Sequence, residues 1–250
     1  MSDRLKYVGK QESKAVDAYE KVMGTAHYVG DLVFPGMLHA KLLTSPIPHG
    51  TITKLNTAPA LDVPGVKAVL TSEDFVDHGA WGWPVRDIYV LAYRKVRYLG
   101  DPIAVVAAET EEAAEAGVKA IELKLEPLPV VSDMERALDK DAPLVPLEAP
   151  AGEGNLCDRM IVRYGDPAPL LDEAEVRLKR SFHLLHQDHA YIETEGVVAI
   201  PEPDGGITVF ANNQSPFINR DTAAEVLGLS TDMVRIIQPP VGGSFGGKDD

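Results

Sequence analysis

The sequence predicts a mixed α/β protein of the α+β kind, built from two successive domains. Its length of 250 residues exceeds the usual size of one domain, and a hydrophobic content of 45% is enough for two cores. Segments of strand and helix character alternate along it, and a stretch dense in proline and acidic residues at 126–169 separates two better-patterned halves. We therefore expect residues 1–130 and 131–250 to form separate domains.

In the first half, the sequence predicts a sheet with one helix. Segments with strand-like composition lie within residues 36–56, 65–70, 103–108 and 121–125. The run Ile103–Ala108 is continuously apolar and rich in β-branched residues at its centre, which favours a central strand. Thr110 then caps a helix whose first turn carries two glutamates, as the helix dipole favours. Residues 75–91 look irregular.

The second half predicts a strand pair or meander followed by a helix and another strand. Its strand-like segments are residues 176–183, 195–201, 207–210 and 233–237. A turn is expected at Pro203–Gly206, between the second and third of them. Ser215 is a good helix cap before Pro216, and Gly228 ends that helix. We expect its inner face to consist of Phe217, Ala224 and Leu227.

Composition argues against several classes of partner. Acidic residues outnumber basic ones by 38 to 24, and a net charge of −14 would repel nucleic acid and anionic membranes. The sequence contains no apolar run of the ~20 residues that span a bilayer and no signal-like N-terminal core, so cytoplasmic residence is expected. The single cysteine, Cys157, cannot hold an iron–sulfur cluster, because the common clusters need four thiolates.

The strongest local motif is the glycine loop, Gly242–Lys248, with the sequence Gly-Gly-Ser-Phe-Gly-Gly-Lys. Glycines let backbone N–H groups approach an oxyanion or a cofactor closely. The loop also nearly matches the phosphate-binding pattern G-x-x-x-x-G-K-[ST], but Asp249 occupies the position of the magnesium-binding hydroxyl. A glycine turn without a ligand is the remaining alternative.

Two other groups of polar residues carry weaker signals. On a strand, His183 and His189 would share one face while His186 points away, which disfavours a zinc site. Glu193 and Glu195 would share a strand face as well, but nothing in the sequence places them in a cleft. We interpret both glutamates as structural, with support of the residues that line the site as the alternative role.

Several segments, in order and spacing, resemble the large subunit of the molybdenum hydroxylases of the xanthine dehydrogenase and aldehyde oxidase family. Those similar to its α/β-hammerhead domain are Lys21–Asp31, Leu43–Pro46, Pro64–Val66 and Arg97–Pro102. Gln187–Glu193 resembles the entry into the cofactor-binding domain, and the glycine loop resembles the family's Gly-Gly-Gly-Phe-Gly-Gly-Lys, with Ser244 where glycine is usual. The resemblance implies a hammerhead domain over 1–130 and an incomplete molybdopterin-binding domain over 131–250.

The resemblance also implies roles for individual residues. Gln214 falls where the family has a glutamine that hydrogen-bonds a molybdenum oxo ligand, and Phe245 would form part of the substrate-side wall. Asp249 takes the position of a glutamate that orients the substrate in purine-hydroxylating members, although it is one methylene shorter. Nothing in this chain matches the family's general-base glutamate. The residues expected to contact the cofactor are Gln214, Gly242, Gly243, Ser244, Phe245, Gly246 and Gly247.

The implied cofactor is a molybdenum-pyranopterin, in its cytosine dinucleotide form, whose dithiolene holds the metal without protein ligands. The implied reaction oxidises an aldehyde or an N-heteroaromatic carbon with oxygen from water, and electrons leave through [2Fe–2S] and FAD partner chains. A further partner would carry the C-terminal half of the molybdenum-binding domain, if the chain is a natural split subunit rather than a piece of a longer chain; we favour the split. A non-catalytic assembly or scaffold subunit and a nucleotide-binding protein are the alternatives.

Overall fold

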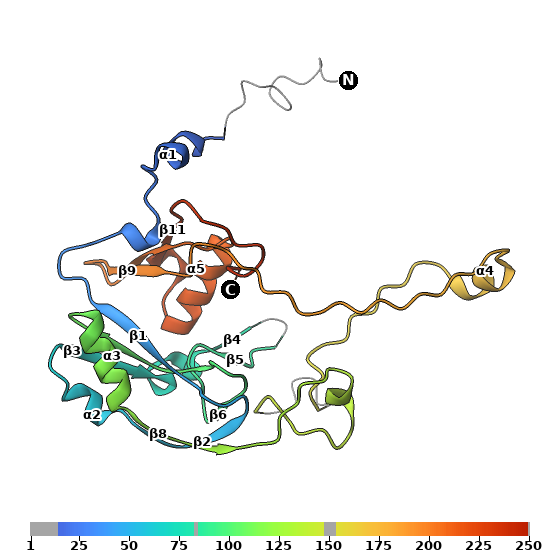
Figure 1. Cartoon of the computed structure of the whole chain (residues 1–250), viewed down its shortest axis with the longest axis horizontal. Helices are drawn as coiled ribbons and strands as arrows, with labels where there is room; N and C mark the ends of the chain where they lie inside the picture. Colours follow the sequence, from blue (N-terminus) through green and yellow to red (C-terminus); the bar gives the residue numbers. More distant parts are fainter. Residues whose placement is uncertain (1–14, 83–84, 148–153, 250) are drawn as a thin grey trace. The chain divides into compact units, whose positions relative to one another are not determined.

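The computed structural model describes residues 15–82, 85–147 and 154–249, which fall into two compact units (Figure 1). The central unit is Leu38–Asp188. The terminal unit combines the chain up to Met37 with His189–Asp250, so it draws on both ends of the sequence. This grouping by contact differs from a division of the sequence near residue 130, which stays a prediction.

The central unit is built around strand β7 (Pro102–Ala108), which lies between β1 (His39–Thr44) and β3 (Val66–Thr71) and pairs antiparallel with both. Ile103, Ala104, Val106 and Ala108 on this strand are completely buried. The sequence-based prediction of a central strand over 103–108 is therefore confirmed.

A second antiparallel sheet in this unit has the order β6–β2–β8, formed by β6 (Lys95–Val96), β2 (Gly50–Asn56) and β8 (Glu122–Pro127). Val96 is fully buried and packs with Ala92 and Ile103. The predicted irregular stretch 75–91 contains one short strand pair, β4 (Ala80–Trp81) with β5 (Ile88–Tyr89). Two-residue strands are too short to give a periodic signal in the sequence.

Helix α3 (Glu111–Ala120) packs closely on the first sheet and near the short helix α2 (Ala58–Leu61). The Thr110 hydroxyl accepts a hydrogen bond from the Ala113 N–H at 3.1 Å, so the predicted N-cap is confirmed. Gly117 faces the sheet, because a Cβ built there would lie 2.7 Å from Val106 Cγ1. The helix can approach the strands this closely only with glycine at that position.

The last part of the central unit is a long, exposed excursion over residues 155–188, which runs out to helix α4 (Pro167–Glu173) and back (Figure 1). The strand predicted over 176–183 is wrong, because these residues form no regular structure and are exposed. A strand needs neighbouring backbone partners, and no segment of the described chain pairs with this one.

In the terminal unit, strand β10 (Ile207–Ala211) pairs antiparallel with β9 (Val197–Pro201) and parallel with β11 (Val234–Ile237). The Gly206 N–H donates to Asp204 Oδ1 at 2.9 Å in the predicted hairpin turn. The parallel pair requires a crossover, which is made by α5 (Pro216–Leu227) and the 3-10 turn Thr231–Met233.

Helix α5 begins and ends where predicted, but two details of the prediction are wrong. The Ser215 side chain does not cap the helix; its hydroxyl donates to the carboxylate of Asp249 instead. Ala224 is buried, whereas Phe217 and Leu227 are 73% and 44% exposed. The second buried residue of the helix is Val226, one position before Leu227.

The N-terminal segment joins the terminal unit after helix α1 (Ala18–Met23) and the 3-10 turn Val29–Asp31. The Phe34 ring lies 5.7 Å from the Phe210 ring on β10. Val29 is buried, and a Cβ at Gly196 would lie 2.5 Å from its Cγ1. In the described part of the chain, no helix has the length and apolar character needed to cross a membrane.

Candidate functional site at the glycine loop

The glycine loop follows β11 in the terminal unit and packs against the segment His189–Glu193. A Cβ at Gly242 would lie 2.5 Å from Glu193 Cβ, and a Cβ at Gly247 would lie 2.6 Å from Tyr191 Cε1. Gly246 has φ +97°, a conformation that side chains rarely adopt. The glycines are therefore required both by close packing and by backbone conformation.

Ser244 and Phe245 occupy the middle of the loop and differ in backbone conformation. Ser244 is not among the residues with positive φ, so a serine at this position brings no backbone strain. Phe245 has φ +56°, which costs a side-chain-bearing residue roughly 1–2 kcal/mol. Its side chain is 77% exposed, so this strain is not compensated by burial of the ring in the described chain.

Some backbone N–H groups at the centre of the loop have no acceptor in the described chain. The Gly242 and Gly246 N–H groups donate to side chains, and the Gly247 N–H donates to the Ser244 carbonyl at 3.0 Å. Within the described residues, the N–H groups of Gly243, Ser244 and Phe245 meet no acceptor. Three consecutive free donors suit a ligand rich in acceptor atoms.

Gln214, which the sequence resemblance singled out, lies beside this loop. Its backbone N–H donates to the Lys248 carbonyl at 2.9 Å. Its side-chain Oε1 accepts from the Gly246 N–H at 3.2 Å and from the Ser244 hydroxyl. With the oxygen engaged in this way, Nε2 is the end of the amide that remains to donate to a ligand.

Asp249 is brought to the first turn of α5 rather than into the loop. Its carboxylate accepts from the Ser215 hydroxyl, and its side chain is exposed. The residue thus neighbours Gln214 in space through Ser215, and its role toward a substrate stays a prediction.

A buried ion pair between Glu193 and Lys248 is the part of the site that sequence reasoning missed. Lys248 Nζ lies 3.2 Å from Glu193 Oε2, and the side chains are 1% and 15% exposed. The Gly242 N–H donates to the same oxygen at 2.6 Å. The ammonium also lies 4.7 Å above the centre of the Tyr191 ring.

The surroundings of the Glu193 carboxyl group favour its ionised form. Burial raises the pKa of Glu193, but hydrogen bonds from Gly242, Asn212 and Lys248 and the charge of the ammonium outweigh it, so the pKa lies below its usual value. The enclosed ammonium has no open face toward a phosphate. The arrangement therefore speaks against the phosphate-loop alternative, in which this lysine would bind nucleotide.

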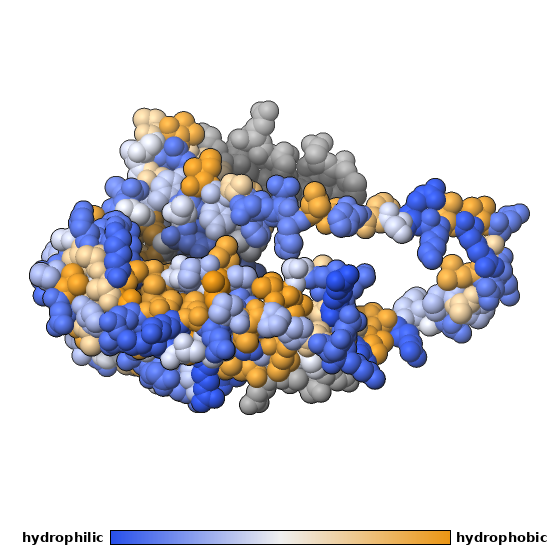
Figure 2. All heavy atoms as spheres, turned by 60° about the horizontal axis from the view of Figure 1, so that its bottom comes forward, coloured by the Kyte–Doolittle hydropathy of each residue, from blue (hydrophilic) through white to orange (hydrophobic). Residues whose placement is uncertain are grey.

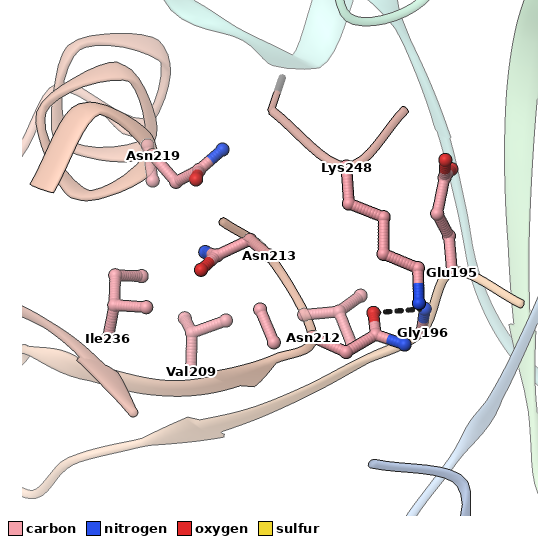
Figure 3. Close-up of a pocket in the computed structure, with 11 residues that line it drawn as sticks. Glu195, Gly196, Val209, Asn212, Asn213, Asn219, Ile236 and Lys248 are labelled. Atoms are coloured by element: carbon pink, nitrogen blue, oxygen red, sulfur yellow. Dashed lines mark hydrogen bonds between the residues drawn. The ribbon is translucent and has the colours of Figure 1, made fainter. Parts of the chain in front are cut away.

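A cavity of about 360 Å³ lies beside Lys248 in the terminal unit (Figure 3). Val209 and Ile236 form part of its apolar wall, and Figure 3 shows the Asn213 and Asn219 side chains directed into it. Asn213 is 6% exposed, and neither of its amide atoms has a hydrogen-bond partner in the described chain. The neighbouring Asn212, by contrast, has partners: it accepts from the Gly196 N–H at 3.0 Å and donates to the Thr194 carbonyl at 2.8 Å.

The histidines singled out in the sequence are not brought together. His183 and His186 are exposed on the excursion of the central unit, whereas His189 packs on the glycine loop in the terminal unit. Among the described residues, no group of three histidine, cysteine or acidic side chains could hold a metal ion. Cys157 is exposed and not part of a disulfide.

Comparison with protein families gives two successive matches. Residues 23–129 match the "Aldehyde oxidase and xanthine dehydrogenase, a/b hammerhead domain", and residues 150–250 match the "Molybdopterin cofactor-binding domain". The second match contains Gln214 and the whole glycine loop.

Individual relatives cover almost all of this chain. A protein of Bacillus subtilis described as a probable xanthine dehydrogenase subunit is 37% identical over 97% of the chain, which spans 32% of that protein. The nicotinate dehydrogenase large molybdopterin subunit of Eubacterium barkeri is 34% identical over the full chain, which spans 57% of it. The aldehyde oxidoreductase structure from Desulfovibrio gigas superposes with a TM-score of 0.81 at 27% identity, over 94% of this chain and 27% of that one. The chain therefore spans between about a quarter and just over half of these relatives.

Proposed function

Because the chain belongs to the aldehyde oxidase and xanthine dehydrogenase family, we propose that it supplies the hammerhead domain and part of the cofactor site of a molybdenum-dependent oxidoreductase. The observation that carries the proposal is the row of open N–H groups at Gly243, Ser244 and Phe245, beside the free amide nitrogen of Gln214. The enzyme would oxidise an aldehyde or an N-heteroaromatic carbon with oxygen derived from water.

The glycine loop fits a molybdenum-pyranopterin cofactor, for which we propose the cytosine dinucleotide form. The N–H groups of the loop that have no protein acceptor would meet acceptor atoms of the cofactor. Gly242 and Gly247 pack closely on the segment His189–Glu193, so a ligand would approach the loop backbone from the side opposite that segment. When bound, the cofactor would supply the redox centre that accepts two electrons from the substrate.

The side chains around the loop would then have distinct tasks. Gln214 Nε2 would donate a hydrogen bond at the metal's ligands, where developing charge needs a preorganised donor. The exposed Phe245 ring would form part of the substrate-side wall, and Asp249 would orient a substrate near the start of α5. The general base would come from outside this chain, since no residue here is matched to that role.

Electron transfer would require other polypeptides. The sequence holds one cysteine, and an iron–sulfur cluster of the common types needs four thiolates. We therefore propose a [2Fe–2S] chain and an FAD chain as partners, together with polypeptide that completes the molybdenum-binding domain. The chain would be active only within such a complex.

The decisive experiment is to measure molybdenum in the purified complex, with and without this chain, alongside turnover of aldehyde and N-heterocycle substrates. We expect stoichiometric metal and activity in the intact complex and loss of both when the chain is omitted. Full metal content without this chain would instead identify a non-catalytic assembly or scaffold subunit.

ATP binding that depends on magnesium and is abolished in Lys248→Ala would support the nucleotide-binding alternative.

A further inference from the structure

The first and last residues of the glycine loop meet on one carboxylate oxygen. Glu193 Oε2 accepts from the Gly242 N–H at 2.6 Å and from the Lys248 ammonium at 3.2 Å. Both contacts are charge-assisted, which makes each about twice as strong as a neutral hydrogen bond. The carboxylate thereby links the two ends of the loop, while the N–H groups without an acceptor lie in its middle.

Because the ion pair is buried, the link between the two ends of the loop should be lost when either Glu193 or Lys248 is replaced. The Lys248 side chain is 1% exposed, and the Tyr191 ring lies against its ammonium. Removal of one partner leaves the other as an uncompensated buried charge, which is far more damaging than the loss of an exposed ion pair. The loop has no room to adjust at Gly242, where Glu193 Cβ already fills the space of a side chain.

We propose that Glu193 is a positioning residue, which holds both ends of the glycine loop so that the N–H groups of Gly243, Ser244 and Phe245 keep the arrangement that receives the cofactor. This inference rests on the proposed function for its ligand. The Glu193–Lys248 pair itself is a property of this chain, and it can be tested without the cofactor.

The first test compares hydrogen exchange in the full complex, prepared free of molybdenum, for wild type and Glu193→Gln. The substitution keeps the size of the side chain and removes its charge. Amides at Gly242 and Gly246–Lys248 should exchange roughly ten- to a hundredfold faster, as expected for the loss of a hydrogen bond to a charged group. Strands β9 and β10 should exchange as in wild type, which shows that the unit is still folded. The matched control is Glu202→Gln, which removes an exposed carboxylate in the same unit, bonded to Thr208 and away from the loop.

A second variant separates charge from shape. In Glu193→Gln with Lys248→Met, no buried charge is left unpaired, so loop protection should recover in part relative to Glu193→Gln alone. Molybdenum retained after gel filtration of the loaded complexes should fall in Glu193→Gln and stay at the wild-type level in Glu202→Gln.

The outcomes are distinguishable. Unchanged loop exchange in Glu193→Gln would overturn the inference, and so would faster exchange with wild-type metal retention, since the loop would then be loosened without consequence for the cofactor. Faster loop exchange together with lower metal retention supports it. A wild-type complex without molybdenum would overturn the proposed function and the cofactor part of this inference, while the exchange data would still decide whether Glu193 holds the loop.

Discussion

Phe245 combines two unfavourable features for an ordinary structural residue. Its backbone lies in the left-handed region at φ +56°, and its ring is 77% exposed. Strained residues of this kind persist where the surroundings hold them, and they cluster at ligand sites. The neighbouring Gln214 is likewise exposed, with its oxygen engaged by the loop. Both residues are therefore better suited to contact a ligand than to stabilise the fold.

The two side chains should differ in how their loss affects catalysis. In the assembled complex, Gln214→Ala should lower kcat by roughly ten- to a thousandfold, the range for losing one preorganised donor. Phe245→Ala should raise KM or alter substrate preference, because a wall contact serves ground and transition states alike. Steady-state kinetics with melting temperature and molybdenum content measure these effects. A loss of ~3–5 kcal/mol of stability in Phe245→Ala would show instead that its ring is a core residue. Full activity with normal metal in Gln214→Ala would exclude that residue from the site.

The ionised state of Glu193 predicts an acid-sensitive contribution to stability. Its folded pKa is lowered, so the contribution is complete above the unfolded pKa of about 4.3 and is lost as the pH falls through the lower folded value. The other donors to this carboxylate, the Gly242 N–H and the Asn212 amide, do not titrate. Urea unfolding at several pH values should show wild type more stable than Glu193→Gln near neutral pH, with the difference narrowing in acid. A difference that is constant with pH would contradict this assignment.

At the scale of elements, the strands and helices that could be predicted are those whose sequence pattern lies within a few consecutive residues. Strand β7 is a continuous apolar run, and α3 has its cap at Thr110 and its acidic first turn in consecutive residues, so both could be predicted. The segment 176–183 has strand composition but no partner in the described chain, and composition does not reveal partners. Ser215 has the residue type of a cap, yet its hydroxyl is taken by Asp249, which lies far away in sequence.

The candidate site shows the same limit. The glycine loop is a contiguous motif, and resemblance to a family singled out Gln214, which the structure then brings beside the loop. The Glu193–Lys248 pair joins residues far apart in the sequence that no spacing rule connects. A glutamate on a strand-like segment and a lysine after glycines each have a more ordinary interpretation, so only the folded arrangement brings them together.

Packing of α3 on the sheet makes Gly117 a sensitive position. In Gly117→Ala, the new methyl would lie 2.7 Å from Val106 Cγ1 and 3.0 Å from Val66 Cγ2, both on strands. Overpacking of this kind costs about 1–3 kcal/mol, more than the gain of ~1 kcal/mol from helix propensity. Chemical denaturation should therefore show net destabilisation. The control Ala116→Leu adds bulk on the exposed face of the same helix and should be near neutral. A more stable Gly117→Ala protein would show that the helix is free to shift.

At the scale of the whole molecule, the excursion 155–188 is notable for large apolar side chains that are exposed. Phe182, Leu184 and Leu185 are between 81% and 90% exposed. Figure 2 shows hydrophobic residues interspersed with hydrophilic ones along it. Phe182, Leu184 and Leu185 lie close together in the sequence, and clustered exposed apolar side chains mark interaction sites in native proteins. We therefore expect the excursion to contact the rest of the complex that we propose.

The 250-residue chain expressed alone should consequently be poorly stable. We expect a broad melt and strong binding of a hydrophobic dye, both reversed when the partner chains are added, because binding to the folded state alone stabilises it. The double substitution Phe182→Ser and Leu185→Ser should lower dye binding by the isolated chain and weaken its assembly with the partner chains. If these two side chains were buried instead, the same substitutions would unfold the chain. A monomeric chain with a sharp cooperative melt and no dye binding would contradict this prediction.

The composition of the terminal unit also has a consequence for how the protein is made. Val29 and Phe34 pack against Gly196 and Phe210, and the entire central unit is synthesised between these partners. At about 5–20 residues per second, the ribosome needs on the order of ten to thirty seconds to cover that interval. The central unit is continuous in sequence and can fold as it emerges. The N-terminal segment meanwhile waits with its apolar side chains uncovered, so the nascent chain is exposed to chaperones and proteases until β9 and β10 are complete.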